Sequence, residues 1–318
     1  MKTKNKIVLL LFSLLLFSCE DILEEDISDK TAVVIYPLNN TTVTSNVVNF
    51  QWHEMKGATS YRLQIIAEDQ QIVLDKSVTQ TSFTAPVVPG NYQWRVRGEN
   101  FAYNSAYSVN IPFSVIESDD LRNKQVILLS PDVDFYTNNT NLIFTWSRIV
   151  EAASYTFQLQ RVTNGGAIIN QQEGIVQTSL QINPSIINQD AEYVWKVKAV
   201  NDEGETLYSE RRFYLDRVAP NRPINQSPLN NSTHNSNQSV NFVWSAVTDS
   251  GTIQSDVTYV IEISDNEGFT SLAYSSNSDT NSFTQTFANT GTYYWRVKAM
   301  DKANNFSTPS AGFKLVLN

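Results

Sequence analysis

Acidic side chains in expected loops are the residues of this chain best suited to binding a metal ion. They gather toward the C-terminus: Asp249, Asp256, Asp265, Glu267 and Asp301. Hard cations such as Ca²⁺ bind several carboxylate and carbonyl oxygens at once. No spacing among these residues matches a defined calcium loop, and loop aspartates also serve as turn residues. We therefore predict no metal cofactor, with a calcium site at Asp249, Asp256 and Asp301 as the alternative.

Groups for acid–base or nucleophilic catalysis are scarce. The chain has two histidines, His53 and His234, far apart in sequence, and neither has an evident partner for a catalytic triad or a zinc site. The sequence contains no glycine-rich phosphate loop, no Cys-x-x-Cys pair and no serine framed by glycines. We predict that the protein is not an enzyme.

Aromatic residues suited to binding concentrate in segment 100–107. Phe101, Tyr103 and Tyr107 stand there among asparagine and serine side chains. Such rings can stack on sugars or anchor a protein loop, because aromatic anchors carry much of the energy of an interface. The alternative is that Phe101 and Tyr107 pack over the end of a folded domain. A second candidate surface is the pair at 135–136.

The single cysteine, Cys19, follows a basic start and the apolar run 7–17. This order is typical of a secretory signal, and the run is shorter than the roughly 20 residues of a membrane-spanning helix. Segment 16–19 resembles the lipobox of bacterial lipoproteins. The resemblance implies a signal peptide over 1–18 and acyl chains on Cys19, which attach the chain to a membrane. The alternative is a free thiol, or a buried residue that ends an uncleaved helix.

The segment after Cys19 is strongly acidic. Residues 19–32 form either a solvated tether or, by resemblance, the surface-export signal of Bacteroidetes lipoproteins. The formal net charge of −9 becomes −12 if Lys2, Lys4 and Lys6 leave with the signal. A chain this acidic is a poor partner for nucleic acid.

The rest of the chain contains three copies of one unit, at intervals of about 100 residues. Each copy carries a proline, a Phe-x-Trp segment, a segment that begins with tyrosine, and a late Tyr-x-Trp segment. The Phe-x-Trp segments are 50–52, 144–146 and 242–244, and the Tyr-x-Trp segments are 92–94, 193–195 and 293–295. The third copy has an insertion at 248–256. These segments alternate apolar and polar residues, the pattern of half-buried strands.

The alternation, and the lack of helical periodicity after the signal, predict an all-β protein of three tandem antiparallel β-sandwiches. The order of the motifs resembles that of fibronectin type III domains, which have an immunoglobulin-like fold. The resemblance implies that Tyr92, Tyr193 and Tyr293 are tyrosine corners, each with its hydroxyl bonded back to the chain. The third copy also resembles the N-terminal domain of starch-utilisation surface lipoproteins.

Tryptophans could in principle form an exposed sugar-binding surface, but the alternation places all six on the same strand faces as the core residues. We predict that the following tryptophans are core residues: Trp52, Trp94, Trp146, Trp195, Trp244 and Trp295.

Domain boundaries follow from the motifs and from the polar or proline-containing segments between them. We expect domains at 33–116, 126–215 and 227–318, joined by linkers at 117–125 and 216–226.

Two functions fit these features. The first is a lipid-anchored, non-catalytic binding or scaffold protein of the outer membrane, exposed at the cell surface, with an extracellular glycan as the leading ligand class. The second is an accessory subunit of an outer-membrane secretion or uptake complex, held by protein contacts. The glycan as ligand class rests on analogy of fold.

Overall fold

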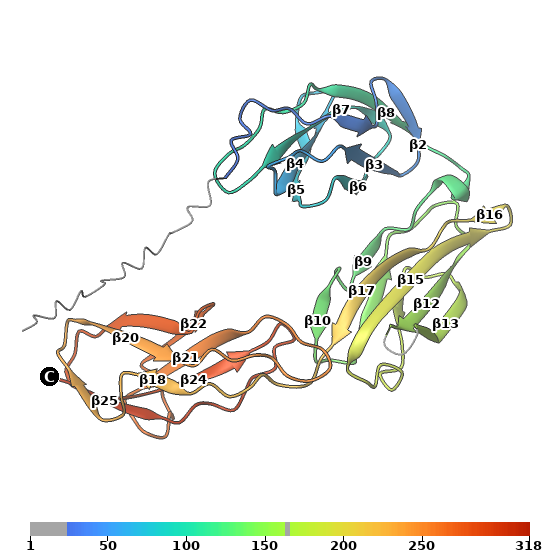
Figure 1. Cartoon of the computed structure of the whole chain (residues 1–318). Helices are drawn as coiled ribbons and strands as arrows, with labels where there is room; N and C mark the ends of the chain where they lie inside the picture. Colours follow the sequence, from blue (N-terminus) through green and yellow to red (C-terminus); the bar gives the residue numbers. More distant parts are fainter. Residues whose placement is uncertain (1–23, 163–165) are drawn as a thin grey trace, which may run out of the picture. The chain divides into compact units, whose positions relative to one another are not determined.

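The computed structural model describes residues 24–162 and 166–318. Cys19 and the predicted signal peptide lie outside these ranges. The one helical element in them is the short 3₁₀ helix η1 (Leu121–Asn123), and no helix of the described part is long and apolar enough to cross a membrane. The strands form three sandwiches of two sheets each, so the chain is all-β (Figure 1).

Domain 1 extends from Val34 to Ile116. Its smaller sheet has the order β1 (Val34–Tyr36), β3 (Val47–Trp52), β6 (Ser82–Pro86). Its larger sheet has the order β2 (Thr41–Thr44), β8 (Ile111–Ile116), β7 (Gly90–Glu99), β4 (Ser60–Ala67), β5 (Ile72–Val78).

Domain 2 repeats this arrangement from Leu128 to Leu215. The smaller sheet has the order β14 (Ser179–Gln181), β11 (Ile143–Trp146), β9 (Leu128–Ser130). The larger has the order β10 (Phe135–Thr137), β17 (Ser209–Leu215), β15 (Ala191–Asn201), β12 (Ser154–Arg161), β13 (Ala167–Ile175), and the short β16 (Gly204–Glu205) pairs with β15.

Domain 3 extends from Asn225 to Leu317. The smaller sheet has the order β18 (Asn225–Ser227), β20 (Ser239–Trp244), β23 (Ser282–Thr286). The larger has the order β19 (Ser232–His234), β25 (Phe313–Leu317), β24 (Gly291–Met300), β21 (Thr258–Ser264), β22 (Tyr274–Ser278). Domains 2 and 3 together form one compact unit, Glu117–Asn318, and domain 1 belongs to another that ends at Ile116.

The repeated proline is the point at which the chain changes sheets. In each domain the strand before it pairs with the smaller sheet, and the strand after it joins the last strand of the larger sheet. That second pairing is parallel in all three domains, whereas the other strand pairs are antiparallel. The peptide bonds before Pro37, Pro131 and Pro228 are all cis.

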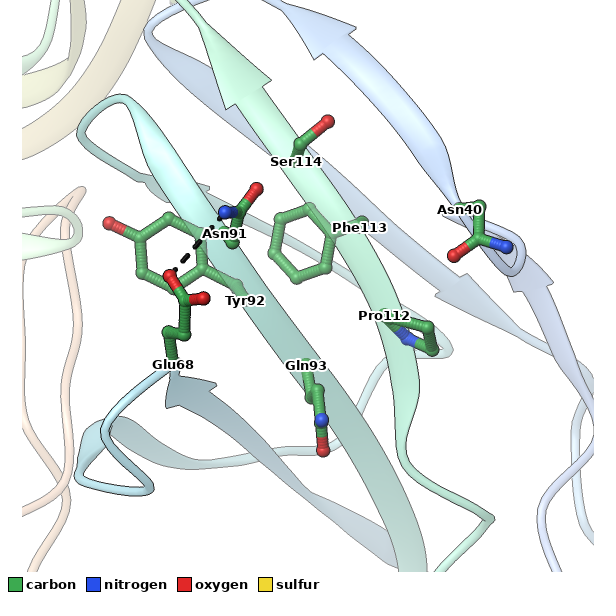
Figure 2. A pocket seen from close by; sticks show the side chains of 8 residues that line it. All are labelled: Asn40, Glu68, Asn91, Tyr92, Gln93, Pro112, Phe113 and Ser114. Carbon is green, nitrogen blue, oxygen red and sulfur yellow. Dashed lines mark hydrogen bonds between the residues drawn. The ribbon is translucent and has the colours of Figure 1, made fainter.

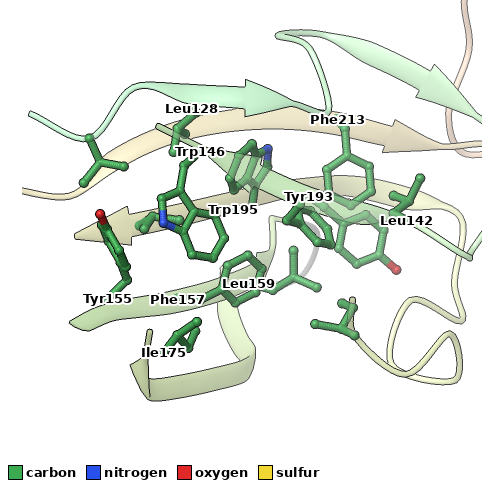
Figure 3. Close-up of a cluster of buried hydrophobic side chains, with 14 of the residues drawn as sticks. Leu128, Leu142, Trp146, Tyr155, Phe157, Leu159, Ile175, Tyr193, Trp195 and Phe213 are labelled. Atoms are coloured by element: carbon green, nitrogen blue, oxygen red, sulfur yellow. The ribbon is translucent and has the colours of Figure 1, made fainter. Parts of the chain in front are cut away.

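The tryptophans lie in the cores, where the alternation predicts them. All six side chains are 0–1% exposed. In domain 2 the ring of Phe144, on the smaller sheet, lies 5.3 Å from Trp195 on the larger one. Trp195 also faces Phe157 (Figure 3). Phe50 meets Trp94 in domain 1 and Phe242 meets Trp295 in domain 3, both at 5.1 Å. Each core therefore joins its two sheets through the same aromatic pair.

The tyrosine corner is present in two domains. The hydroxyl of Tyr92 donates to the carbonyl of Val88 (3.1 Å), and that of Tyr193 donates to Gln189 (2.7 Å). Among the described residues Tyr293 has no such bond, and its ring packs against Phe287 at 4.9 Å. The expectation of three corner bonds is therefore wrong for domain 3.

The segments before domains 1 and 2 are not free tethers where the structure describes them. Ile27 and Ala32 are buried in the core of domain 1, so the described end of the predicted tether, residues 19–32, packs on that domain. In the predicted linker 117–125, Leu121 is buried in the core of domain 2. The described end of the tether and the predicted linker therefore each contribute to the core of the sandwich that follows.

Candidate functional site

The segment after β7 presents one aromatic ring fully to solvent. Asn100 organises the turn: its side-chain oxygen accepts from the N–H groups of Ala102 (3.1 Å) and Tyr103 (2.8 Å), and its Nδ2 donates to the carbonyls of Gly57 and Glu25. Phe101 is 96% exposed on this turn and Tyr103 is 37% exposed. The alternative that Phe101 packs over the end of the domain is therefore wrong.

Tyr107 does not join that exposed surface. Its ring is covered by the guanidinium groups of Arg95 and Arg97, at 4.4 and 4.9 Å from the ring centre. Burial raises the pKa of its hydroxyl. The three aromatic residues that the sequence grouped therefore divide into an exposed pair, Phe101 and Tyr103, and a half-buried ring on the face of the sheet.

The second aromatic candidate lies where domains 2 and 3 meet. Tyr136 stacks on Tyr214 at 4.5 Å, and Lys302 of domain 3 lies 5.8 Å from the centre of the Tyr136 ring. Phe135 beside it is 40% exposed. Tyr136 therefore contributes to the junction between the domains.

A pocket of about 350 Å³ lies on the larger sheet of domain 1 (Figure 2). It is lined by residues of the neighbouring strands β7 and β8 and of two nearby loops: Asn40, Glu68, Asn91, Tyr92, Gln93, Pro112, Phe113 and Ser114. The rings of Tyr92 and Phe113 stack at 5.6 Å. Phe113 is buried, whereas Tyr92 is half-buried and keeps part of its ring at the surface.

Polar groups form most of the rest of the pocket lining. Asn91 Nδ2 donates to a carboxylate oxygen of Glu68 at 3.4 Å, and Gln93 Oε1 accepts from Asn110 at 3.0 Å. Amides and a carboxylate beside an aromatic ring can exchange hydrogen bonds with a polyhydroxylated ligand while the ring contacts its apolar face. The alternation of β7 could have indicated these outward residues, but nothing in the sequence brings Glu68 and Asn40 beside them.

Three buried carboxylates meet at the junction of domains 2 and 3. One oxygen from each of Asp216, Asp249 and Asp301 lies within 4.8 Å of an oxygen of the other two. Asp216 directly follows β17 of domain 2, Asp249 lies in the insertion of domain 3, and Asp301 directly follows β24. They are 0%, 5% and 3% exposed.

Backbone geometry positions the insertion against the linker. Gly251 has a φ of 93°, and a Cβ placed on it would lie 3.0 Å from the Cβ of Val218. Only glycine lets the loop turn and approach the linker this closely. Asp249 is held by the N–H groups of Ser250 and Ser255, both at 2.8 Å.

The electrostatics at Asp216 are unfavourable for a charged carboxylate. Burial, together with the neighbouring carboxylates of Asp249 and Asp301, raises its pKa to about 6, although a hydrogen bond from Val218 N–H opposes the change. Oδ1 accepts that bond at 3.0 Å. Oδ2 is buried and has no hydrogen-bond partner among the described residues. None of the three carboxylates forms an ion pair with another described residue.

The sequence identified part of this cluster and missed part. Asp249 and Asp301 meet as expected. Asp256 lies outside the cluster, exposed and paired with Lys302 at 2.7 Å. Asp216 lies in the predicted linker, because no local spacing in the sequence relates it to Asp249 and Asp301.

The histidines do not meet: neither His53 nor His234 has a side-chain hydrogen bond or ion pair with a described residue, and they belong to different domains.

The solved structures similar to this chain include two sets of fibronectin domains. The FN1–FN3 domains of chicken CNTN1 match with 16% identity and a TM-score of 0.44, over 91% of this chain and 99% of that one. The fibronectin(III)-like modules of Clostridium thermocellum CbhA match with 11% identity and a TM-score of 0.23, over 58% of this chain and 94% of that one. No protein-family model and no curated protein matches the chain.

Proposed function

We propose that this chain is a non-catalytic, lipid-anchored protein of a bacterial outer membrane that binds a carbohydrate at the cell surface with domain 1. The observation that carries the ligand class is the pocket on β7 and β8. It combines a partly exposed tyrosine ring with the amides of Asn91 and Gln93 and the carboxylate of Glu68. A sugar offers an apolar ring face and several hydroxyls, which match these groups.

The anchor in this proposal is Cys19, acylated after removal of residues 1–18. One acyl chain gives reversible attachment, whereas two or more hold a protein on a bilayer. Palmitate labelling of cells that express the wild type and Cys19→Ala tests this step. Label that depends on Cys19 supports the anchor, and equal label or no label on both proteins contradicts it.

The carbohydrate proposal is tested on a glycan array with paired variants. Asn91→Ala/Gln93→Ala removes two amides from the pocket without touching the core. Its matched control is Thr292→Ala/Tyr294→Ala, at the equivalent positions of β24 in domain 3. We expect the domain 1 variant to lose about tenfold or more in affinity for any glycan that the wild type binds, since each lost hydrogen bond costs about 0.5–1.5 kcal/mol. Equal loss in both variants, or binding that survives in the first, contradicts the assignment.

The exposed turn of domain 1 favours a second function, that of an accessory subunit in an outer-membrane complex. Phe101 is 96% exposed on a turn that Asn100 fixes with four hydrogen bonds. A rigidly held aromatic ring is suited to a pocket on a partner protein. Purification from detergent-solubilised membranes distinguishes the two: partners that co-purify with the wild type and are lost with Phe101→Ala support the subunit.

A further inference from the structure

The three domains close the same end of the sandwich in comparable ways, so their residues can be matched position by position. Backbone bonds fix the register: His53 N–H donates to Val33, Ser147 N–H to Ile127, and Ser245 N–H to Ile224, each at 2.8 Å. Counting back from Val33, Ile127 and Ile224 makes Lys30, Lys124 and Asn221 equivalent.

Domains 1 and 2 place a lysine at this position, and the lysine neutralises a carboxylate. Lys30 Nζ contacts Glu25 at 2.7 Å and donates to the carbonyl of Lys56 at 2.9 Å. Lys124 forms an ion pair with Glu151, and both side chains are largely buried. Domain 3 has Asn221, which donates to the carbonyl of Thr248 at 3.1 Å and brings no charge.

A second position also makes this end of domain 3 more negative. After the long strand of the larger sheet, domains 1 and 2 have Asn100 and Asn201, whose Nδ2 groups donate to the carbonyls of Gly57 (2.8 Å) and Glu151 (3.1 Å). Domain 3 has Asp301 instead, close to Asp249, the residue equivalent to Gly57 and Glu151. At this end, domain 3 therefore has an amide where domains 1 and 2 have a lysine. It also has a carboxylate where they have an amide.

No basic side chain among the described residues pairs with these carboxylates. The neighbouring cations are engaged elsewhere: Arg217 pairs with Asp190 at 2.6 Å and Lys302 pairs with Asp256. The fully buried Oδ2 of Asp216 has no partner among the described residues. Isolated buried charge is costly unless it is paired or coordinates a metal. A cation from solution would supply the partner that the described residues lack.

We propose that Asp216, Asp249 and Asp301 bind a Ca²⁺ ion at the junction of domains 2 and 3. The ligands are hard oxygens on irregular loops, which suit the flexible coordination of Ca²⁺ by 6–8 oxygens better than the strict octahedron of Mg²⁺. On the proposed cell-surface location, the calcium sites of extracellular modules suggest a dissociation constant on the order of 10⁻⁴ M.

The ion would connect two domains, since Asp216 belongs to domain 2. Its N–H donates to the carbonyl of Thr137 in β10 (2.9 Å), and its own carbonyl accepts from Asn305 of domain 3 (2.9 Å). Asn305 also accepts from Asn138 of domain 2 and donates to Asp301. Occupation by Ca²⁺ therefore stabilises this network and the relative position of domains 2 and 3.

The test is calorimetric titration of Ca²⁺ into the full-length protein in detergent, together with thermal unfolding in Ca²⁺ and in EDTA. The key variant is Asp301→Asn, because it installs the residue that domains 1 and 2 already use at this position. We expect one saturable site in the wild type. At about 100 times the dissociation constant, we expect Ca²⁺ to raise the unfolding midpoint of domains 2 and 3 by roughly 5–10 °C. Asp301→Asn should fold and lose both effects.

The matched control is Asp256→Asn, a nearby acidic residue outside the cluster, which should keep the wild-type heat and midpoint shift. If the wild type shows no saturable heat and no shift with millimolar Ca²⁺, the carboxylates are stabilised without a metal, by a shared proton, and the proposal is wrong. Binding that survives Asp301→Asn, or that is lost in Asp256→Asn, contradicts the assigned ligands.

Discussion

Domains 2 and 3 have the same fold and similar aromatic cores. They differ in how the buried carboxylates at one end are neutralised. Domain 2 carries its own cation, Lys124, against Glu151, whereas domain 3 brings together three carboxylates without a basic partner in the described chain. The two sandwiches therefore share the buried aromatic residues at their centres and differ in the charged residues at one end. In the calcium proposal, that variation makes the end of domain 3 depend on an ion from solution.

The largest expected loss of stability tests whether the aromatic cores of domains 2 and 3 are equivalent. Trp195→Ala and Trp295→Ala should each destabilise their own domain by about 3–5 kcal/mol, because each removes a fully buried indole that contacts the opposite sheet. Urea unfolding monitored by fluorescence of the remaining tryptophans gives the two values. A difference of several kcal/mol between them would mean that the cores are not equivalent and would undermine the comparison.

An intermediate loss of stability tests the ion pair between Lys124 and Glu151 in domain 2. Lys124→Met should destabilise that domain by about 2–3 kcal/mol at neutral pH, because it leaves the carboxylate of Glu151 partly buried and unpaired. Methionine keeps the volume of the lysine stem. Urea unfolding measures the change, and a loss below about 0.5 kcal/mol, the size of an exposed pair, would contradict this role.

The pH dependence of the same variant gives an independent check. The hydrogen bond from Lys124 lowers the pKa of Glu151 below 4.5. A lowered folded-state pKa gives stabilisation that is present above the unfolded pKa and is lost as the pH falls through the folded value. The difference in stability between the wild type and Lys124→Met should therefore shrink as the pH is lowered below about 4.5. A difference that stays constant on acidification would contradict the ion pair as its cause.

The smallest effect on stability is expected at the exposed turn of domain 1. Phe101→Ala should change the free energy of unfolding by less than about 0.5 kcal/mol, because the ring makes no core contact. Asn100→Ala in the same turn should cost more, since it removes the bonds that shape it. Denaturant midpoints compare the two, and a larger loss for Phe101→Ala would mean that its ring packs in the folded protein.

The sequence predicted the features that depend on local alternation. Phe50 and Trp52 share one face of a strand because the side-chain period is two, and the third copy obeys the same rule through Phe242 and Trp244. Motif order could therefore give three all-β sandwiches, and the alternation could assign the tryptophans to their cores. The one parallel pair in each domain was not visible, because it depends on where the chain crosses between sheets after the proline.

The features that the sequence did not predict are set by contacts between residues far apart in the chain. Ile27 sits in an acidic segment that resembles a solvated tether, yet it is buried in domain 1, because segment 25–32 lies against the turn at Gly57. Asp216 looked like a linker residue because Asp249 and Asp301 approach it only after domain 3 has folded. Tyr293 has the motif of a corner tyrosine but packs on Phe287, so the motif alone does not fix the bond.

The most direct test of the account is to give domain 3 the lysine of domain 2 and measure its dependence on Ca²⁺. Asn221→Lys places an ammonium where Lys124 pairs with Glu151, opposite the equivalent Asp249. We predict that this variant has a higher unfolding midpoint than the wild type in EDTA and that added Ca²⁺ no longer raises it. An unchanged Ca²⁺-induced shift in Asn221→Lys, or no shift in the wild type, would contradict the account.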